Sequence, residues 1–392
     1  MEPLERRMPT FTGANRDIEV DREDMTAPKV VKLNHDEACF DTGEGRPLPW
    51  VEKGHEPMAP KRGQKLMCSG VVSQYGLESR RIIKPGKNSD GYWTNRDLIT
   101  QIREDGPALV LKYPGCLLLW VFDCSANHKM YAPNALIASR LNLGDGFPKR
   151  TASDIAAEIA PVAFRDTTWV DSLGVAHVQS FSIKDDAGII IGHKGIYTIL
   201  KERDLWRDKQ TVELPICRLL PGFEGPINNK KRLITVVEKM LLPEALALLE
   251  MQPDFLGQKE KCWVTETVES LGMLSIAKFL PPFHCIFAEI EMLWGCAKRY
   301  TRAHCDYSLE GLISTVPLAL ESVSLCTIRR HFEHVTRYMK AYRMGTLSPA
   351  QVEWAMRKYT SHRRIKEADI DELEKDFLRP TYFKDMPKDL SD

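Results

Sequence analysis

Three acidic residues occupy sequence contexts that could bring their carboxylates together. Asp36 and Asp123 each lie in or directly after an apolar run that predicts a buried strand, and Glu291 lies at the start of an amphipathic helical pattern. Strand ends and a helix start can meet at one edge of a sheet. Three carboxylates gathered there would repel one another without a cation, and their oxygens suit Mg²⁺ or Mn²⁺. The sequence therefore predicts a phosphoryl-transfer site with a pair of divalent ions.

Each acid also has a structural interpretation. An aspartate at a strand end, such as Asp36 or Asp123, commonly caps a turn, and Glu291 could complement a helix dipole. Glu37 and Glu289 are neighbouring candidates. In a strand, however, Glu37 points to the face opposite Asp36. In a helix, Glu289 lies about 200° from Glu291. Asp36, Asp123 and Glu291 are therefore the predicted catalytic and metal-binding residues.

The elements that must position Asp36 come early in the chain. Strand-like segments at 29–39, 48–53 and 65–73 are separated by turns rich in Gly and Pro. Such spacing predicts an antiparallel meander with Asp36 on its first strand.

A helix and a buried strand should position Asp123. Thr94 is the expected N-cap of a helix that runs to about residue 112. The segment 116–122 is apolar throughout, which predicts a strand covered on both faces rather than an exposed edge. A further helix is expected at 132–140.

The stretch 141–258 has a mixed pattern. Strand character at 169–182 is followed by a helical pattern at 195–206, a loop at 212–225 and a helix at 231–251. We expect this stretch to be an insertion within the domain rather than a separate module.

The last third of the chain is mostly helical. A short strand is expected at 274–279, and no internal repeat is found. The element order predicts a mixed α/β sheet of ribonuclease-H-like topology, flanked by helices and followed by a helical C-terminal region. The helices are expected at 287–302, 309–318, 325–342, 348–359 and 367–377.

Four segments follow from this pattern. Residues 1–28 are polar and patternless, which predicts disorder. The catalytic domain should span 29–300, a basic helical region 301–378, and a tail 379–392.

Composition excludes membrane-spanning and secreted classes. Of the 392 residues, 43% are hydrophobic and 28% charged, which is ordinary for a globular protein with two or three domains. No apolar stretch approaches the roughly 18 residues that span a bilayer, and no secretory signal is evident. We expect a nuclear or cytoplasmic protein.

The cysteines indicate reduced thiols rather than a zinc framework. The ten cysteines are scattered, without a Cys-x-x-Cys pair. The doublets His284-Cys285 and His304-Cys305 fit no standard finger spacing.

The distribution of charge points to a nucleic-acid partner although the formal net charge is zero. Residues 296–366 contain thirteen Lys or Arg against five acids. A solvated helical surface explains any single helix, but a sustained excess beside a carboxylate site favours phosphate contact. The candidate contacts are Lys298, Arg299, Arg302, Arg363 and Arg364.

Three blocks in this order resemble the catalytic blocks of mariner-like DDE transposases, and the resemblance runs from about residue 29 to 365. Further blocks resemble a group of fungal DDE-superfamily endonuclease proteins. The three catalytic blocks are His35-Asp36-Glu37-x-x-Phe40, Asp123-x-Ser125-x-Asn127-His128 and Ile290-Glu291-x-x-Trp294-Gly295-x-x-Lys298-Arg299. The further blocks include Asp90-Gly91-Tyr92-Trp93-Thr94-Asn95 and Gln252-Pro253-Asp254-Phe255.

The resemblance implies metal-dependent cleavage and transfer of DNA strands. Asp36 would bridge two Mg²⁺ or Mn²⁺ ions, with Asp123 and Glu291 each completing one side. His128 would orient the scissile phosphate, although a histidine satisfied by local contacts is an equal alternative. Trp294 is expected to anchor the core behind Glu291. DNA is the implied partner, and a homodimer is left open.

Several departures from the family pattern keep two other functions open. Cys124 and Ala288 stand where the family usually has Asn, and 168 residues separate Asp123 from Glu291. Only about 28 residues precede the first strand, whereas a paired helix-turn-helix region needs on the order of 100. A catalytically inactive, transposase-derived DNA-binding protein is the alternative, and an unrelated α/β interaction protein is the third.

Overall fold

The chain forms two compact units. The computed structural model describes residues 2–43, 63–147, 164–206, 243–259, 261–282, 284–306 and 308–343. The first unit combines residues 1–128 with 264–392, and the second is the intervening stretch 129–263. The predicted elements at 48–53, 212–225, 348–359 and 367–377, most of 231–251, and Arg363 and Arg364 lie outside the described residues.

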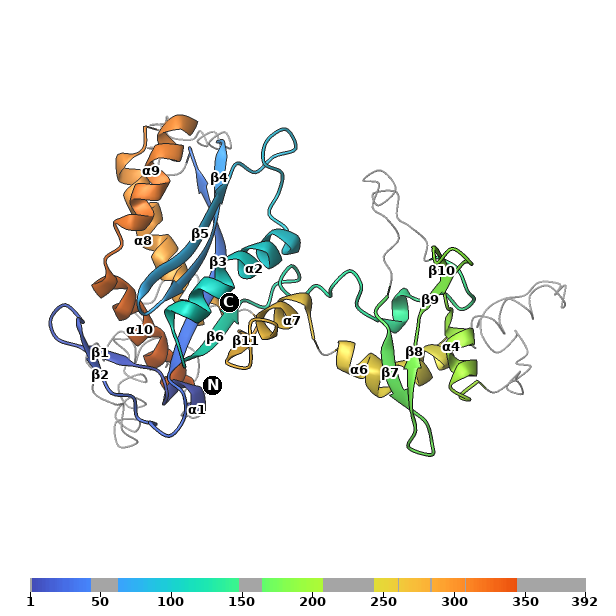
Figure 1. The fold of residues 1–392 in the computed structure, drawn as a ribbon. Helices are drawn as coiled ribbons and strands as arrows, with labels where there is room; N and C mark the ends of the chain where they lie inside the picture. The colour runs from blue at the N-terminus through green and yellow to red at the C-terminus, as the bar shows by residue number, and fades with distance from the viewer. Residues whose placement is uncertain are drawn as a thin grey trace, which may run out of the picture. The chain divides into compact units, whose positions relative to one another are not determined.

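A mixed five-stranded sheet is the centre of the first unit (Figure 1). Its order is β11-β6-β3-β4-β5, in which β3, β4 and β5 are antiparallel neighbours. β6 runs parallel to β3, and β11 runs parallel to β6. The strands are β3 (Val30–Asp41), β4 (Lys65–Ser73), β5 (Gly76–Ile83), β6 (Leu117–Phe122) and β11 (Ser275–Phe279).

The central strands are buried on both faces. All six residues of β6 are buried, as are the first six of β3. Helices cover both faces of the sheet, so these strands show a continuous apolar pattern instead of alternation. The prediction of a mixed α/β sheet with a buried strand before Asp123 is confirmed.

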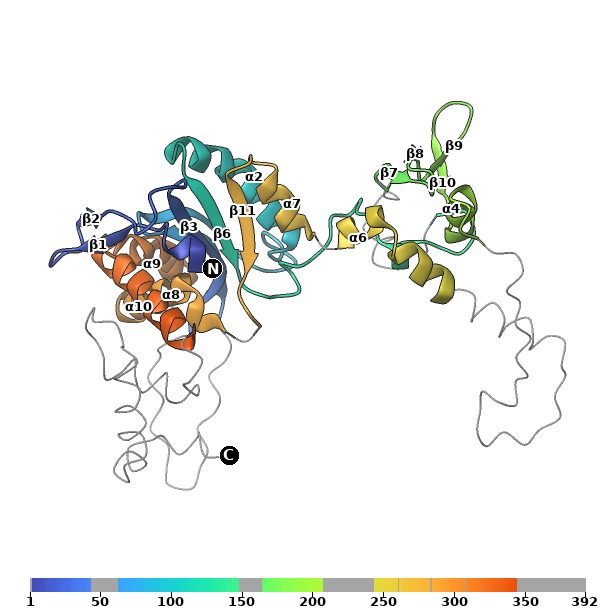
Figure 2. The same ribbon diagram turned by 90° about the horizontal axis from the view of Figure 1, so that it is seen from below.

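Helices lie on the two faces of this sheet (Figure 2). On one face, α2 (Asn95–Lys112) begins where the Asp97 carboxylate accepts hydrogen bonds from the backbone and hydroxyl of Thr94, the expected cap. On the other face lie α8 (Glu289–His304), α9 (Leu309–Glu321) and α10 (Leu325–Arg343).

The core on the second face packs around Trp294 of α8. Its ring meets Phe40 of β3 edge to face, with the ring centroids 6.4 Å apart. A Cβ on Gly70 of β4 would lie 2.8 Å from Trp294, so only glycine fits there without a shift. Trp294 is therefore a core residue, as expected.

Residues 2–28 contain regular structure, which corrects the prediction of disorder for this segment. They form α1 (Glu2–Glu5) and a hairpin of β1 (Thr10–Thr12) and β2 (Ile18–Val20). The guanidinium of Arg329 in α10 lies 3.7 Å from the centre of the Phe11 ring, and its Nε donates to the carbonyl of Gln74 at 3.1 Å. These contacts join residues at least 255 positions apart, so no local pattern reveals them.

Two other predictions differ from the structure. β5 was not predicted, because its sequence GLESRRII is half polar. The helix expected at 132–140 is only a 3₁₀ turn at Ala138–Arg140. The Pro133-Asn134 pair at its start favours a turn, and Ala135 donates to the carbonyl of Ala132.

The second unit has a core of its own, although an insertion within the main domain was expected. β7 (Thr167–Val170) pairs with β8 (Ala176–Gln179), and β9 (Ser182–Lys184) pairs with β10 (Ile190–His193). The described helices of this unit include α4 (Ile196–Glu202) and α6 (Pro253–Lys259). The strand character expected at 169–182 is divided among separate strands, and in the turn between β7 and β8 the Asp171 carboxylate accepts two backbone hydrogen bonds.

Among the described helices, none is long and apolar enough alone to cross a membrane. α9 and α10 meet the length and composition test only as a pair bent by 71°.

Candidate carboxylate site

Strand β3 directs every second side chain towards the start of α8. The ammonium of Lys32 donates to the carboxylate of Glu289 at 2.5 Å, and both side chains are buried. Two residues on, the side-chain oxygen of Asn34 accepts the backbone N–H of Ile290 at 3.1 Å. Asp36 is the next residue on this face, because side chains alternate along a strand.

The pKa of Asp36 reflects a crowd of carboxylates. Burial raises it to about 7, and the charge of Glu291 is the next largest cause. Glu37 and Asp123 raise it further. Asp36 is half-buried and Glu291 is exposed on the first turn of α8. The structure thus places both Glu291 and Asp123 within electrostatic reach of Asp36.

Asp123 follows the last residue of β6 and turns towards His128. Its carboxylate accepts the backbone N–H of Ser125 at 3.1 Å and contacts Nδ1 of His128. Burial would raise the pKa of Asp123, but the hydrogen bond and positive charge of His128 outweigh it and hold the pKa at about 2. Asp123 is therefore ionised throughout the neutral range.

His128 joins two carboxylates from different strands. Its Nε2 lies 3.3 Å from the carboxylate of Glu37 on β3, while Nδ1 faces Asp123. Burial alone would lower the pKa of His128, but the two carboxylates raise it to about 10. Because the ring is buried and both its nitrogens have partners, His128 positions Asp123 rather than contacting a phosphate.

The tautomer of His35 is set by a chain of hydrogen bonds. Ser79 donates to the Asp105 carboxylate, Gln101 donates to Ser79 at 2.8 Å, and Ser69 donates to Gln101 at 2.7 Å. The Ser69 oxygen must therefore accept from Nε2 of His35, 2.9 Å away. Burial lowers the pKa of His35 to about 4, so the ring is neutral.

Two groups of residues could hold a metal. Within the described ranges, His35, Glu37 and His128 are the one set of three whose ligand atoms all lie within 4.8 Å of one another. His128 already neutralises Glu37 there, so this set is satisfied without an ion. Asp36 and Glu291 offer hard oxygen ligands whose mutual repulsion a divalent cation would relieve, which fits Mg²⁺ or Mn²⁺.

The competing acids turn away from this pair, as the sequence predicted. Glu37 points to the opposite face of β3 and contacts His128, and Glu289 is buried against Lys32. The roles of Lys32 and Asn34 were not foreseen. A lysine inside an apolar strand was the available signal for a buried ion pair. Asn34 supplies the cap that Ala288, at the N-cap position of α8, lacks.

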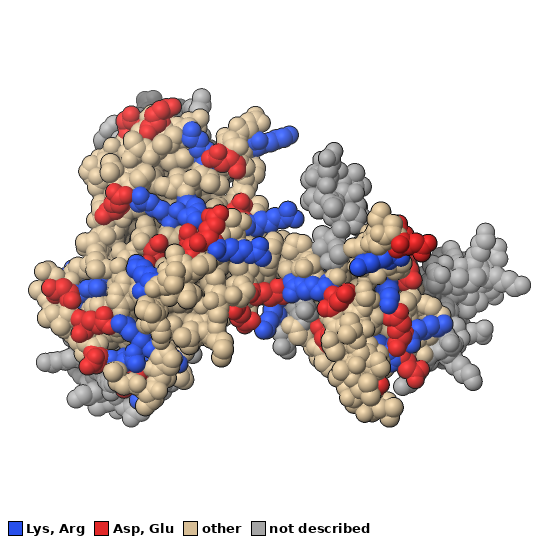
Figure 3. All heavy atoms as spheres, viewed as in Figure 1, with Lys and Arg blue, Asp and Glu red and all other residues tan. Residues whose placement is uncertain are grey.

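The predicted phosphate contacts of α8 share a face with Glu291. Glu291, Gly295, Arg299 and Arg302 are all exposed, at spacings of three or four residues that place them on one stripe of the helix. The face of the first unit seen in Figure 3 differs, because positive and negative side chains alternate there. Within the first unit, Arg81 pairs with Glu104 and Asp105.

No family model matches this chain, and no curated protein matches it significantly. Among solved structures, the Mos1 transposase paired-end complex with left transposon end is 20% identical over 26% of this chain and 30% of its own, with a TM-score of 0.20. The Mos1 mariner paired end complexes with Mn and with Mg are 21% and 19% identical over 25% of this chain, with TM-scores of 0.20 and 0.19. The matched region spans less than a third of those chains. At such TM-scores the likeness decides nothing about activity.

Proposed function

We propose that this chain is a divalent-metal-dependent DNA endonuclease or transposase domain of ribonuclease-H-like topology, acting in the nucleus or cytoplasm. The observation that carries the proposal is the placement of Asp36 on the central strand, beside the first turn of α8 that bears Glu291. Asp123 ends the neighbouring parallel strand. The strand order β11-β6-β3-β4-β5 supports the topology.

The chain's own residues hold the carboxylates in place. Lys32 and Asn34 fix the first turn of α8, so Glu291 stays beside Asp36. His128, anchored by Glu37, fixes the carboxylate of Asp123. Divalent ions bound by the three carboxylates would supply Lewis-acid activation of the attacking oxygen and stabilise the leaving oxygen.

The exposed stripe of α8 supports DNA as the substrate. Arg299 and Arg302 follow Glu291 along this stripe. Gly295 lies between Glu291 and Arg299 and leaves open space there. A phosphate backbone that reaches the carboxylates can therefore lie against α8 and meet guanidinium groups.

Nicking of supercoiled plasmid tests the proposal. Wild type should nick in Mg²⁺ or Mn²⁺ and stop on addition of a chelator. Asp36→Asn and Asp123→Asn should lose about 100-fold or more in rate, the size of effect expected when transition-state stabilisation is removed. Asp186→Asn, in the exposed turn between β9 and β10, is the matched control and should nick normally.

Two outcomes would contradict the proposal. The first is a folded wild type that nicks with neither metal, which would favour the inactive DNA-binding alternative. The second is an Asp36→Asn protein that nicks as fast as wild type.

A further inference from the structure

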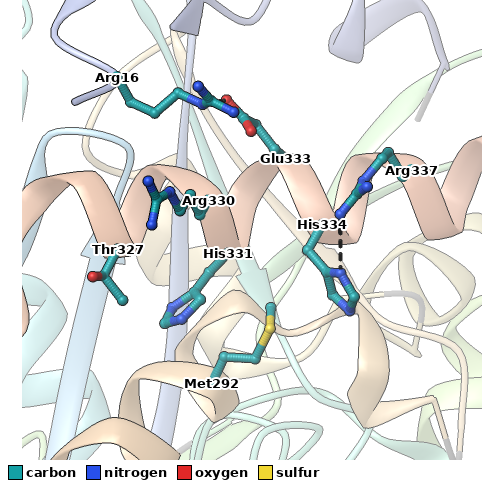
Figure 4. Close-up of a pocket in the computed structure, with 8 residues that line it drawn as sticks. All are labelled: Arg16, Met292, Thr327, Arg330, His331, Glu333, His334 and Arg337. Atoms are coloured by element: carbon teal, nitrogen blue, oxygen red, sulfur yellow. Dashed lines mark hydrogen bonds and ion pairs between the residues drawn. The ribbon is translucent and has the colours of Figure 1, made fainter. Parts of the chain in front are cut away.

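A surface pocket of about 470 Å³ lies along α10 (Figure 4). Its lining includes the adjacent residues Arg330 and His331, with His334 and Arg337 following at spacings of three residues, which places all four on one side of the helix. In Figure 4 the rings of His331 and His334 point from α10 towards Met292 of α8. The pocket therefore has a wall on each of two helices.

The pocket is positively charged. Three guanidinium groups line it, from Arg16, Arg330 and Arg337, against the single carboxylate of Glu333. Arg16, from the N-terminal hairpin, forms an ion pair with Glu333 at 2.7 Å. Among the side chains that line the pocket, guanidinium groups thus outnumber carboxylates by three to one.

Two neutral imidazoles complete the lining. Burial, together with the unfavourable proximity of the second imidazole of His334, lowers the pKa of His331 to about 4. Burial and the charge of Arg337 lower the pKa of His334 in the same direction. Nδ1 of His331 is buried and has no hydrogen-bond partner within the described structure. A neutral imidazole can place an N–H at either nitrogen, so this atom can donate to an anion.

The pocket borders the exposed stripe of α8. Met292 follows Glu291 directly and so lies about 100° round the helix from it. Cys296, one turn further, faces His331 with its sulfur 3.9 Å from Nε2. The pocket is therefore on the flank of α8 that faces α10.

We propose that this pocket binds a backbone phosphate of DNA that crosses α8 from the carboxylate site. Guanidinium groups recognise phosphate through paired hydrogen bonds, and the hydroxyl of Thr327 at the pocket wall offers another donor. The choice of DNA rests on the proposed function, whereas the anionic character of the ligand rests on the lining alone. The pocket would thus hold the strand in register without reading bases.

Fluorescence anisotropy with a labelled duplex of about 30 base pairs, in buffer without divalent metal, tests the inference apart from catalysis. Arg330→Gln is the variant of choice, because Arg330 is exposed and its loss should leave the fold intact. It should weaken binding about three- to tenfold, and the slope of log K against log salt should fall by about one. The matched control is Arg103→Gln, an exposed residue of α2 on the other face of the sheet, which should leave both quantities unchanged.

The outcomes separate this inference from the proposed function. If Arg330→Gln binds DNA with unchanged affinity and salt slope while wild type nicks plasmid, the pocket does not bind a DNA phosphate. The proposed endonuclease function would then still hold. Wild type that neither binds nor nicks DNA would overturn both. Millimolar inorganic phosphate that shifts the His331 and His334 resonances while DNA does not would show a small-anion pocket, and would also overturn the inference.

Discussion

Strand β3 presents different electrostatics on its two faces. Towards α2, the carboxylate of Glu37 is neutralised by His128, which Asp123 also holds. Towards α8, the adjacent Asp36 faces Glu291, and no basic side chain in the described part of the chain pairs with it. Two neighbouring acids on one strand thus differ in their partners: Glu37 has a cationic partner within the protein, and Asp36 faces another carboxylate. The difference is consistent with the proposed function, in which a cation from outside the protein would bind at Asp36 and not at Glu37.

The largest loss of stability should come from breaking the buried ion pair between Lys32 and Glu289, on the face of β3 that packs against α8. Lys32→Met leaves the Glu289 charge buried without a partner, and should lower the free energy of unfolding by about 3–5 kcal/mol. Urea denaturation followed by far-UV circular dichroism measures it. The double variant Lys32→Met with Glu289→Leu should recover most of the loss. A single variant as stable as wild type would show that the pair does not hold α8.

The α2 face should respond less strongly when its cation is removed. His128→Ala leaves Glu37 and Asp123 without their shared partner, and should cost about 2–3 kcal/mol because both acids keep some contact with water. The matched control is His177→Ala, which breaks an exposed His177–Asp171 pair in the second unit and should cost less than about 1 kcal/mol. Equal losses in thermal or urea unfolding would contradict the comparison.

A pH series sharpens the comparison at His35. Its pKa is about 4 in the folded protein and 6.5 in the unfolded chain, so the unfolded chain binds the proton first as pH falls. This group therefore removes about 3 kcal/mol of stability between pH 6.5 and pH 4. His35→Gln should lose this slope while its amide can still donate to Ser69. The stability difference between wild type and variant should then narrow as pH falls; parallel curves would sink the idea.

The smallest effect concerns the cap that β3 gives to α8. Asn34→Ala should cost about 1 kcal/mol, since it removes the acceptor of the Ile290 N–H. Ser308→Ala removes the ordinary cap of α9, where the Ser308 hydroxyl accepts from Gly311, and should cost a similar amount. Only Asn34→Ala should also slow plasmid nicking, because its helix carries Glu291. Equal nicking rates in the two variants would show that the hydrogen bond from Ile290 to Asn34 does not position Glu291 for cleavage.

Much of the central sheet could be predicted because its strands are apolar throughout. β6 and the start of β3 fill the core from both sides, so their sequences alone mark them as buried strands. β5 could not be recognised in the same way, since its polar residues take part in ion pairs such as Arg80–Glu321. The N-terminal hairpin depends on Arg329 and Phe11, whose contact only the folded chain creates.

For the carboxylate site, the sequence could predict on which face of β3 or α8 each acid lies. It could not predict which side chain each acid contacts. Alternation along β3 separates Asp36 from Glu37, and helical geometry separates Glu289 from Glu291. Which group then meets each acid depends on loop conformation. His128 reaches Glu37 because the turn after β6 is fixed by Ser125, whose hydroxyl accepts the His128 N–H at 3.2 Å.

The first and last residues of the second unit lie next to each other in space. Trp263 donates its backbone N–H to the carbonyl of Met130 at 2.8 Å, so the two ends of this stretch touch. The stretch lies in the connection between β6 and β11, which are parallel neighbours and need a long crossover in any case. The short helix α7 (Trp263–Glu269) remains as the return path to β11. The sheet can therefore accept inserted segments of different lengths at this point. Replacing or removing the segment between Met130 and Trp263 should leave the strands of the sheet unstrained.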